Sequence, residues 1–431
     1  MGNVHPAIAS LHPDARLVAT TPTDANVFFG FHDITPWSPD GEKLLCLRLD
    51  PEWQTLADSG GVADICVWEP AKGRLGRVGK TSCWNFQQAA RQQWLIDGSD
   101  RFTFNSCDAS GSCIATVANN DGSEGGSFEG GLYALCPDGV SAISPDFDVL
   151  ADRWPAYGYR ILRGSSASKT ADQVGLWRTD LYSGERKLLI SLATVLAGWQ
   201  GTDSADGHFL THPVFSPDGN RLVFLHRFFA ADGGSYTRML CCQSDGSNLR
   251  VLADEKVSHF DWVDSNTLLA WARFTGGGLA QARASGALNA PLIRPLLNLV
   301  RKFSGRWKKR MLAEAYYSLA ADGSGARQKI GWPALDQDGH PMVARAHDWV
   351  VTDTYPDASG FLTLILWNRH TGQRIDVACF KDGVTTDDSD AKCDLHPRWN
   401  RDETQIAVDY CVGGLRGIAV IDVSDLVGAK T

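Results

Sequence analysis

The sequence predicts an all-β protein: a seven-bladed β-propeller of four-stranded antiparallel blades, closed by an N-terminal strand and carrying one inserted helical segment. Three observations lead to this prediction. A turn motif recurs seven times, a second hairpin follows most of its copies, and an unpaired strand lies near the N-terminus. Together they assign residues 1–431 to a single propeller. Two separate β-sandwiches are the alternative that the repeat leaves open.

The recurring motif is an aromatic or small residue, then Ser-Pro-Asp-Gly, then alternating apolar residues. Its clear copies begin at Trp37 and Phe215. Proline presets the backbone angle of a tight turn and glycine accepts a positive φ, so each copy is typical of a hairpin between two strands. Weaker copies span residues 94–104, 136–143, 262–271, 343–352 and 399–409.

A second pair of strands follows most of these hairpins, which gives four short antiparallel strands per unit. The last unit shows only three strands and ends at residues 417–422, whereas residues 16–20 form a strand without a partner. Pairing these two segments completes the last blade and closes the ring, which protects the sheet edges.

One stretch without the turn motif, residues 290–319, separates the predicted fifth and sixth blades. Its apolar spacing predicts a helical insertion at residues 285–315, and many of its remaining side chains are basic. A solvated basic face is the favoured interpretation. A lid over an anionic substrate and an amphipathic helix that touches acidic lipid are the alternatives, and membrane contact is the least favoured.

Charge and composition exclude several classes of protein. The net charge of −9 and the pI near 5.6 argue against nucleic acid as a partner, because phosphate binding needs a basic surface. We recognise no signal peptide and no apolar run long enough to span a membrane, so a cytoplasmic location is expected. The 11 cysteines are scattered, and most are expected to be buried strand thiols.

Polar side chains recur just before the predicted turns. The first strand of a propeller blade lines the central channel, so these residues are expected to converge there. Five of the 11 histidines occupy this position in five different blades. The converging residues are His32, Gln87 and Gln88, His212, His259, His340 and His396, and the third blade contributes the loop from Arg153 to Tyr159.

Imidazoles from separate strands can coordinate a transition metal, and a nearby thiolate favours a borderline-soft ion. Cys393 precedes His396 by three residues. We therefore predict a divalent metal, zinc, manganese or calcium, at His259, His340, Cys393 and His396. Some of the five histidines are instead expected to be structural.

Six short segments carry a resemblance to a known family: residues 30–37, 84–88, 157–159, 258–262, 353–357 and 393–399. They resemble the propeller polysaccharide lyases, a group that includes oligogalacturonate lyases, ulvan lyases and lyases that release rhamnose from glucuronate. The resemblance implies β-elimination on an acidic oligosaccharide or polysaccharide, with His259 and His396 as a metal pair. In place of two expected ligands this chain has Cys393 and Arg398, and in place of an expected catalytic histidine it has Gln88.

β-Elimination needs a group that neutralises the substrate carboxylate, a base for the C5 proton and an acid for the leaving oxygen. A metal or Arg398 could meet the carboxylate. His212, or a tyrosinate at Tyr157 or Tyr159, could be the base, and a neutral tyrosine could be the acid. The predicted substrate-binding residues are His32, Gln87, Gln88 and Arg153.

Two functions therefore remain open. The first is a lyase acting on a uronate-containing glycan. The second is a non-catalytic propeller that binds a glycan or a protein partner through its polar channel face, which Gln88 in place of a histidine favours. Fold alone does not choose between them.

Overall fold

The computed structural model describes residues 5–166, 168–199, 207–229, 235–254, 256–274 and 314–428. These residues form seven antiparallel sheets, the blades of a seven-bladed β-propeller, which confirms the predicted fold class. The chain divides into two compact units. Unit 1 comprises Met1–Ser168, Arg178–Arg186 and Gly339–Thr431, and unit 2 comprises Lys169–Trp177 and Lys187–Asp338.

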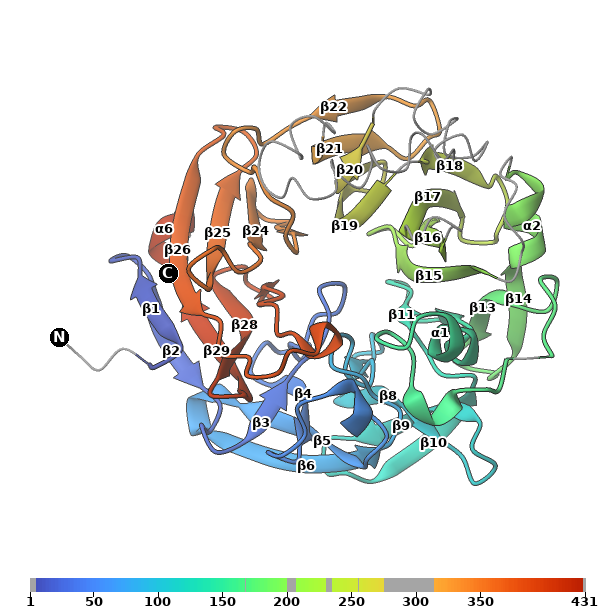
Figure 1. Cartoon of the computed structure of the whole chain (residues 1–431), viewed down its shortest axis with the longest axis horizontal. Helices are drawn as coiled ribbons and strands as arrows, with labels where there is room; N and C mark the ends of the chain where they lie inside the picture. The colour runs from blue at the N-terminus through green and yellow to red at the C-terminus, as the bar shows by residue number, and fades with distance from the viewer. Residues whose placement is uncertain are drawn as a thin grey trace, which may run out of the picture. The chain divides into compact units, whose positions relative to one another are not determined.

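Four whole blades belong to unit 1 (Figure 1). Blade one contains β3 (Asn26–Phe28), β4 (Leu44–Leu49), β5 (Ala63–Glu69) and β6 (Arg74–Thr81). Blade two contains β7 (Gln93–Trp94), β8 (Arg101–Cys107), β9 (Cys113–Asn119) and β10 (Glu124–Glu129). Blade six contains β1 (Ile8–Leu11), β23 (Met342–Val343), β24 (Trp349–Asp353), β25 (Phe361–Asn368) and β26 (Arg374–Lys381). Blade seven contains β2 (Arg16–Thr20), β27 (Arg398–Trp399), β28 (Gln405–Val412) and β29 (Leu415–Asp422).

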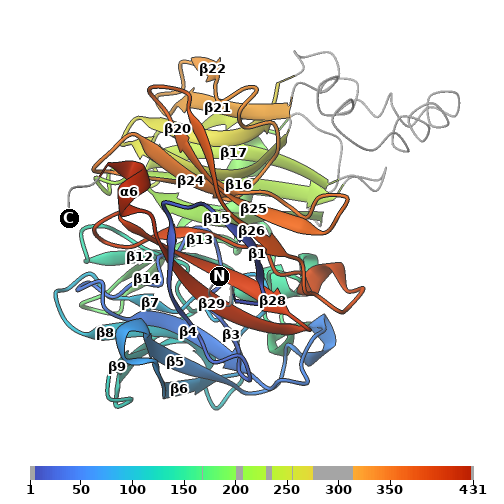
Figure 2. The same cartoon turned by 90° about the vertical axis from the view of Figure 1, so that its left-hand side faces the viewer.

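The N-terminal segment contributes strands to two blades. β2 pairs antiparallel with β29, as the sequence predicts, with Arg16 opposite Asp422. β1 pairs with the outer strand β26 and gives blade six a fifth strand, which the sequence analysis did not predict. Figure 1 shows β1 beside β26 and β2 beside β29, and Figure 2 shows β1 and β26 from the side. Both strands cover an otherwise open sheet edge.

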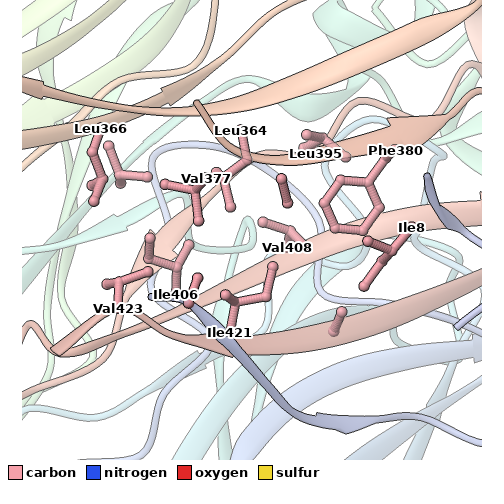
Figure 3. Packing of buried hydrophobic residues seen from close by; sticks show 14 of the residues in the cluster. Ile8, Leu364, Leu366, Val377, Phe380, Leu395, Ile406, Val408, Ile421 and Val423 are labelled. Carbon is pink, nitrogen blue, oxygen red and sulfur yellow. The ribbon is translucent and has the colours of Figure 1, made fainter. Parts of the chain in front are cut away.

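A hydrophobic core fills the space between blades six and seven (Figure 3). Leu364 and Val377 of blade six face Ile406 and Ile421 of blade seven, and all four side chains are fully buried. Strand alternation places every second residue on such a face, so the apolar positions after each turn motif form this core.

Blade three contains β11 (Ala134–Leu135), β12 (Ser141–Pro145), β13 (Gly175–Asp180) and β14 (Arg186–Ser191). Its long β12–β13 connection includes α1 (Phe147–Arg153) and the 3-10 turn η3 (Arg160–Leu162). The other short helices are α2 (Leu192–Ala197), α6 (Ser424–Val427), η1 (Leu56–Asp58), η2 (Pro70–Lys72) and η6 (Ser389–Ala391). No helix in the described parts of the chain is long and apolar enough to cross a membrane.

Unit 2 contains blades four and five. Blade four is built of β15 (His208–Phe215), β16 (Arg221–Phe229), β17 (Ser235–Gln243) and β18 (Arg250–Ala253). Blade five is built of β19 (Lys256–Asp264), β20 (Thr267–Arg273), β21 (Glu314–Ala320) and β22 (Arg327–Lys329). Their shared core includes Leu225, Met239, Trp262 and Leu268.

The position predicted for the insertion is wrong. β20 pairs with β21 along its whole length, so the insertion joins two neighbouring strands of blade five and does not separate blades five and six. Residues 314–319, which were included in the helical stretch, belong to β21. That strand is buried on both faces, so it lacks the alternation that marks a strand in sequence. Residues 285–313 of the predicted insertion lie outside the described residues.

Candidate functional site

Two histidines from neighbouring blades meet in unit 1. His340 lies just before β23, His396 lies just before β27, and their ring centroids are 4.4 Å apart at 85°. Both rings are almost fully buried. His396 has a φ of +44°, a backbone region that few residues other than glycine adopt. Strained backbone of this kind gathers at functional sites, where the surrounding structure maintains it.

Asp353, the last residue of β24, orients both histidine segments. Its carboxylate oxygens each lie 2.9 Å from Nδ1 of His340, and it accepts hydrogen bonds from the backbone N–H groups of His340 (2.7 Å) and His396 (3.3 Å). A carboxylate at Nδ1 leaves Nε2 of His340 as the ligand atom. Gly339 permits this approach, because a Cβ there would overlap the carbonyl oxygen of Asp353.

Asp394 completes a group of ligand atoms. One atom each from His340, Asp394 and His396 lies within 4.8 Å of the others, and all three residues are buried. Two imidazole nitrogens and a carboxylate oxygen are a donor set that suits zinc or manganese, whereas calcium prefers oxygen ligands alone. The residues present therefore fit a divalent transition metal.

Cys393, predicted as a ligand, is not part of this group. Its thiol is buried, and burial raises its pKa well above the ordinary value. The charged neighbours of the thiol include Arg416 and Asp409 as well as Asp394. The next residue, Asp394, contributes the third atom of the group.

Lys392 and Tyr355 flank the group, and the sequence analysis assigned neither a role. The ammonium of Lys392 lies 3.2 Å from Oδ2 of Asp394 and 4.6 Å from the ring centroid of Tyr355. Tyr355 meets His340 edge to face at 5.6 Å. The Lys392 side chain is 43% exposed, so its charge remains open to solvent. Tyr355 lies in one of the segments that carry the family resemblance, the only sequence signal for either residue.

His32 provides a third imidazole of unit 1 near His340 and His396. Its ring centroid lies 5.5 Å from that of His340 and 6.4 Å from that of His396. The Phe31 ring packs against both His396 and Tyr157, with its centroid 5.5 Å from that of His396 and 5.7 Å from that of Tyr157. The structure thus brings together His32, His340 and His396 as the sequence analysis expected.

Gln87 and Gln88, predicted to bind substrate, have structural partners instead. Nε2 of Gln87 donates to the carbonyl oxygens of Asp390 (3.2 Å) and Lys392 (3.4 Å), and so holds the segment that leads to Asp394. Gln88 is fully buried, and its Nε2 donates to the hydroxyl of Tyr133 at 2.8 Å. Gln87 therefore supports the segment that carries Asp394, whereas Gln88 contacts Tyr133 within the fold.

Tyr159 is not suited to be a base. It is fully buried, its hydroxyl accepts a hydrogen bond from Nδ2 of Asn105 at 2.8 Å, and burial raises its pKa well above the ordinary value. A tyrosinate is therefore strongly disfavoured there. Tyr157 is half-buried and stacks on Trp154 at 3.8 Å.

Arg398 contacts backbone groups, whereas the substrate-binding role of Arg153 stays a prediction. Arg398 is buried, and its Nη2 donates to the carbonyl oxygens of His340 (3.3 Å) and Pro341 (3.2 Å), so it supports the His340 segment. Arg153 is exposed at the end of α1.

The two remaining predicted histidines belong to unit 2. Nδ1 of His259 lies 3.1 Å from Oδ1 of Asp338, whose other oxygen accepts a hydrogen bond from Ser258 at 2.6 Å. This carboxylate orients the imidazole as Asp353 orients His340. His212 is buried with a φ of +54°, and its Nδ1 lies 2.8 Å from the hydroxyl of Thr211.

The fold and these contacts define a class of protein, a seven-bladed β-propeller with a buried imidazole and carboxylate group in unit 1. Solved structures with this fold include an oligogalacturonate lyase from Vibrio parahaemolyticus. It is 14% identical with a TM-score of 0.60, over 96% of this chain and 94% of that chain. An oligogalacturonate lyase in complex with manganese is 15% identical with a TM-score of 0.60, over 98% of both chains.

Identity at this level shows a shared fold. No protein-family model matches the chain, and no curated protein matches it. The arguments for function therefore depend on the site itself.

Proposed function

We propose that the protein is a lyase that cleaves a uronate-containing oligosaccharide by metal-assisted β-elimination. The observation that carries this proposal is the ligand group of His340, Asp394 and His396, with His340 oriented by Asp353. The shared fold with an oligogalacturonate lyase that was solved with manganese supports it.

His340, Asp394 and His396 would hold the metal, and Asp353 would keep Nδ1 of His340 protonated so that Nε2 remains a ligand. A bound divalent metal would supply positive charge that neutralises the substrate carboxylate and makes the neighbouring C5–H group more acidic. Zinc or manganese fits the nitrogen donors better than calcium does.

Lys392 is the side chain that we assign to the substrate carboxylate. Its ammonium is partly exposed beside Asp394, whereas the guanidinium of Arg398 is directed at backbone carbonyls. A lysine in this position attracts an anionic sugar as a point charge. Tyr355, against which Lys392 lies, offers an aromatic face at the same place.

The base in this proposal is the imidazole of His32, whose ring centroid lies 5.5 Å from that of His340 in unit 1. It takes the C5 proton on a ring nitrogen, and the electron pair of that bond forms the C4–C5 double bond. The C4–O bond then breaks. The leaving oxygen takes a proton from a tyrosine hydroxyl, for which the half-buried Tyr157 is the candidate.

The test combines metal analysis with an activity assay. The purified protein is analysed for bound metal and then mixed with a panel of uronate-bearing glycans while ultraviolet absorbance of the unsaturated product is followed. We expect about one metal per chain and rising absorbance, with both lost in His396→Ala and retained in the exposed control His370→Ala. Absence of metal and of product on every glycan would refute the proposal.

A non-catalytic glycan-binding propeller is the second candidate function. Two observations favour it: burial disfavours a tyrosinate at Tyr159, and Gln88 stands in place of an expected catalytic histidine. The same glycan panel separates the two functions. Metal-dependent binding measured by calorimetry, with no absorbance change over long incubation, would identify the binding protein.

A further inference from the structure

Three cysteines that have no role in the proposed reaction meet at one end of blade two. β8 ends at Cys107 and β9 begins at Cys113, and the two residues lie opposite each other in the ladder. Cys83 lies in the connection that leads into the blade, and its Sγ is 2.8 Å from Sγ of Cys107. The thiol of Cys83 also interacts with that of Cys113, so it stands between the other two.

We propose that Cys83 and Cys107 form a reversible disulfide, with Cys113 as a third thiol that can exchange with it. A disulfide places its sulfurs about 2.05 Å apart, so the two thiols need a movement of less than about 1 Å to bond. Among the described residues, these three thiols do not form a group that could hold a metal ion. Thiol–disulfide exchange is therefore a better assignment for them than metal binding.

The backbone around the two thiols is already held together. The N–H of Cys83 donates to Oγ1 of Thr81 at 2.9 Å, and Oγ1 of Thr81 donates to the carbonyl oxygen of Asn105 at 2.7 Å. Through Thr81, the segment that carries Cys83 is therefore attached to β8 two residues before Cys107. Bond formation needs little rearrangement, because both chain segments are already in register.

The two thiols differ in accessibility, which gives the reaction a direction. Cys83 is fully buried, whereas Cys107 is partly exposed. A hydrogen bond from Cys83, and a second from Ser82, lower the pKa of the Cys107 thiol. The thiolate is the nucleophile in disulfide exchange, so Cys107 is the residue that an oxidant in solution meets first.

With a small-molecule disulfide such as oxidised glutathione as the oxidant, the steps balance. The Cys107 thiolate attacks one sulfur of the oxidant, forms a mixed disulfide and releases one glutathione thiolate. Cys83 then loses its proton and attacks the Cys107 sulfur, and the second glutathione thiolate leaves. In total, two protein thiols lose two protons and two electrons, and one glutathione disulfide is reduced to two thiols.

The chain contains a matched internal control. Cys46 and Cys66 also lie opposite each other, in the β4–β5 ladder, and both are fully buried. Burial raises the pKa of Cys66 to about 12 and that of Cys46 well above its ordinary value. This pair lacks the accessible thiol of low pKa, so we expect it to stay reduced under conditions that oxidise Cys83 and Cys107.

The experiment uses the full chain, reduced and then incubated in glutathione buffers of graded potential without denaturant. Remaining thiols are blocked, and peptides are mapped by mass spectrometry without reduction. We expect a Cys83–Cys107 cross-link that forms and disappears reversibly, and a reduced Cys46–Cys66 pair. The cross-link should persist in Cys113→Ser and be absent from Cys107→Ser, in which Cys83 stays reduced or bonds with Cys113.

Hydrogen exchange provides a second readout that needs no variant. The bond would tie the first residue of the segment 83–92 to β8, so backbone amides of that segment should exchange more slowly in the oxidised protein. A preferred Cys107–Cys113 bond would overturn the proposal. So would a map in which Cys107 carries only glutathione, or one in which Cys46 and Cys66 oxidise equally readily.

Discussion

Both carboxylate oxygens of Asp353 lie 2.9 Å from Nδ1 of His340, and one of them also accepts the backbone N–H of His396. A single buried carboxylate therefore orients an imidazole of blade six and fixes the segment that carries an imidazole of blade seven. Carboxylate partners of this kind set the tautomer and the orientation of metal-binding histidines.

The substitution Asp353→Asn should weaken metal binding about 10- to 100-fold while the fold is retained, because an amide orients the His340 ring less strongly. Affinity for manganese or zinc, measured by competition with a metal-sensitive dye, checks this. Asp376→Asn, at an exposed position of β26, is the control and should leave affinity unchanged. Unaltered affinity in Asp353→Asn would show that Asp353 does not orient a metal ligand.

Lys392→Met should raise KM for a uronate substrate about 10-fold or more, because a charge-assisted contact contributes roughly 1.5–3 kcal/mol. Metal content should stay the same, and kcat should fall less than KM rises. Steady-state kinetics with Lys381→Met as an exposed control separate charge at this position from charge in general. A fall in kcat at constant KM would instead assign Lys392 to the chemical step.

His226 should make the protein sensitive to acid. Burial, aided by the nearby positive charges of His208 and Arg238, lowers its pKa from 6.5 to about 3. Below about pH 6.5 this histidine binds a proton in the unfolded chain but stays neutral in the folded protein. The neutral His226 therefore contributes less to the free energy of unfolding as the pH falls from 6.5 toward 3. Between pH 6.5 and 5 the loss amounts to about 2 kcal/mol.

Thermal denaturation of His226→Gln across this range checks the sign. The midpoint of the variant should fall less on acidification than that of the parent protein, and His370→Gln, at an exposed position, should follow the parent. Parallel curves for all three proteins would contradict the prediction.

Ile8→Ala should lower the free energy of unfolding by about 2 kcal/mol or more, as is usual when a buried isoleucine is truncated. Ile8 is 4% exposed and packs in the core between blades six and seven, near Phe380 (Figure 3). Urea denaturation followed by tryptophan fluorescence measures the loss. Ser10→Ala, exposed on the same strand, should cost little, and an equal loss in both variants would argue that β1 acts only through backbone pairing.

The repeat of blades was predictable because it is encoded locally. Pro-Asp-Gly at residues 39–41 and 217–219 forms a turn by its own backbone preferences, and the apolar alternation that follows defines a strand face. The same local logic predicted the pairing of β2 with β29 and placed His340 and His396 at equivalent positions of adjacent blades. β1 was not predicted, because a four-residue strand with one buried side chain has almost no periodic signal in the sequence.

What the tertiary structure alone decided is the partner of each polar side chain. Sequence motifs and the family resemblance marked Cys393, Arg398 and Tyr159 as site residues, but packing buries the tyrosine and the thiol and directs the arginine to backbone carbonyls. Asp353 and Asp394 lie in segments that carry the family resemblance, one at the end of a strand and one in a loop, but only the fold brings them to the histidines. Turn chemistry depends on neighbours in sequence, whereas ligand geometry depends on neighbours in space. The sequence therefore determined the propeller and its histidines, and the fold determined which groups surround them.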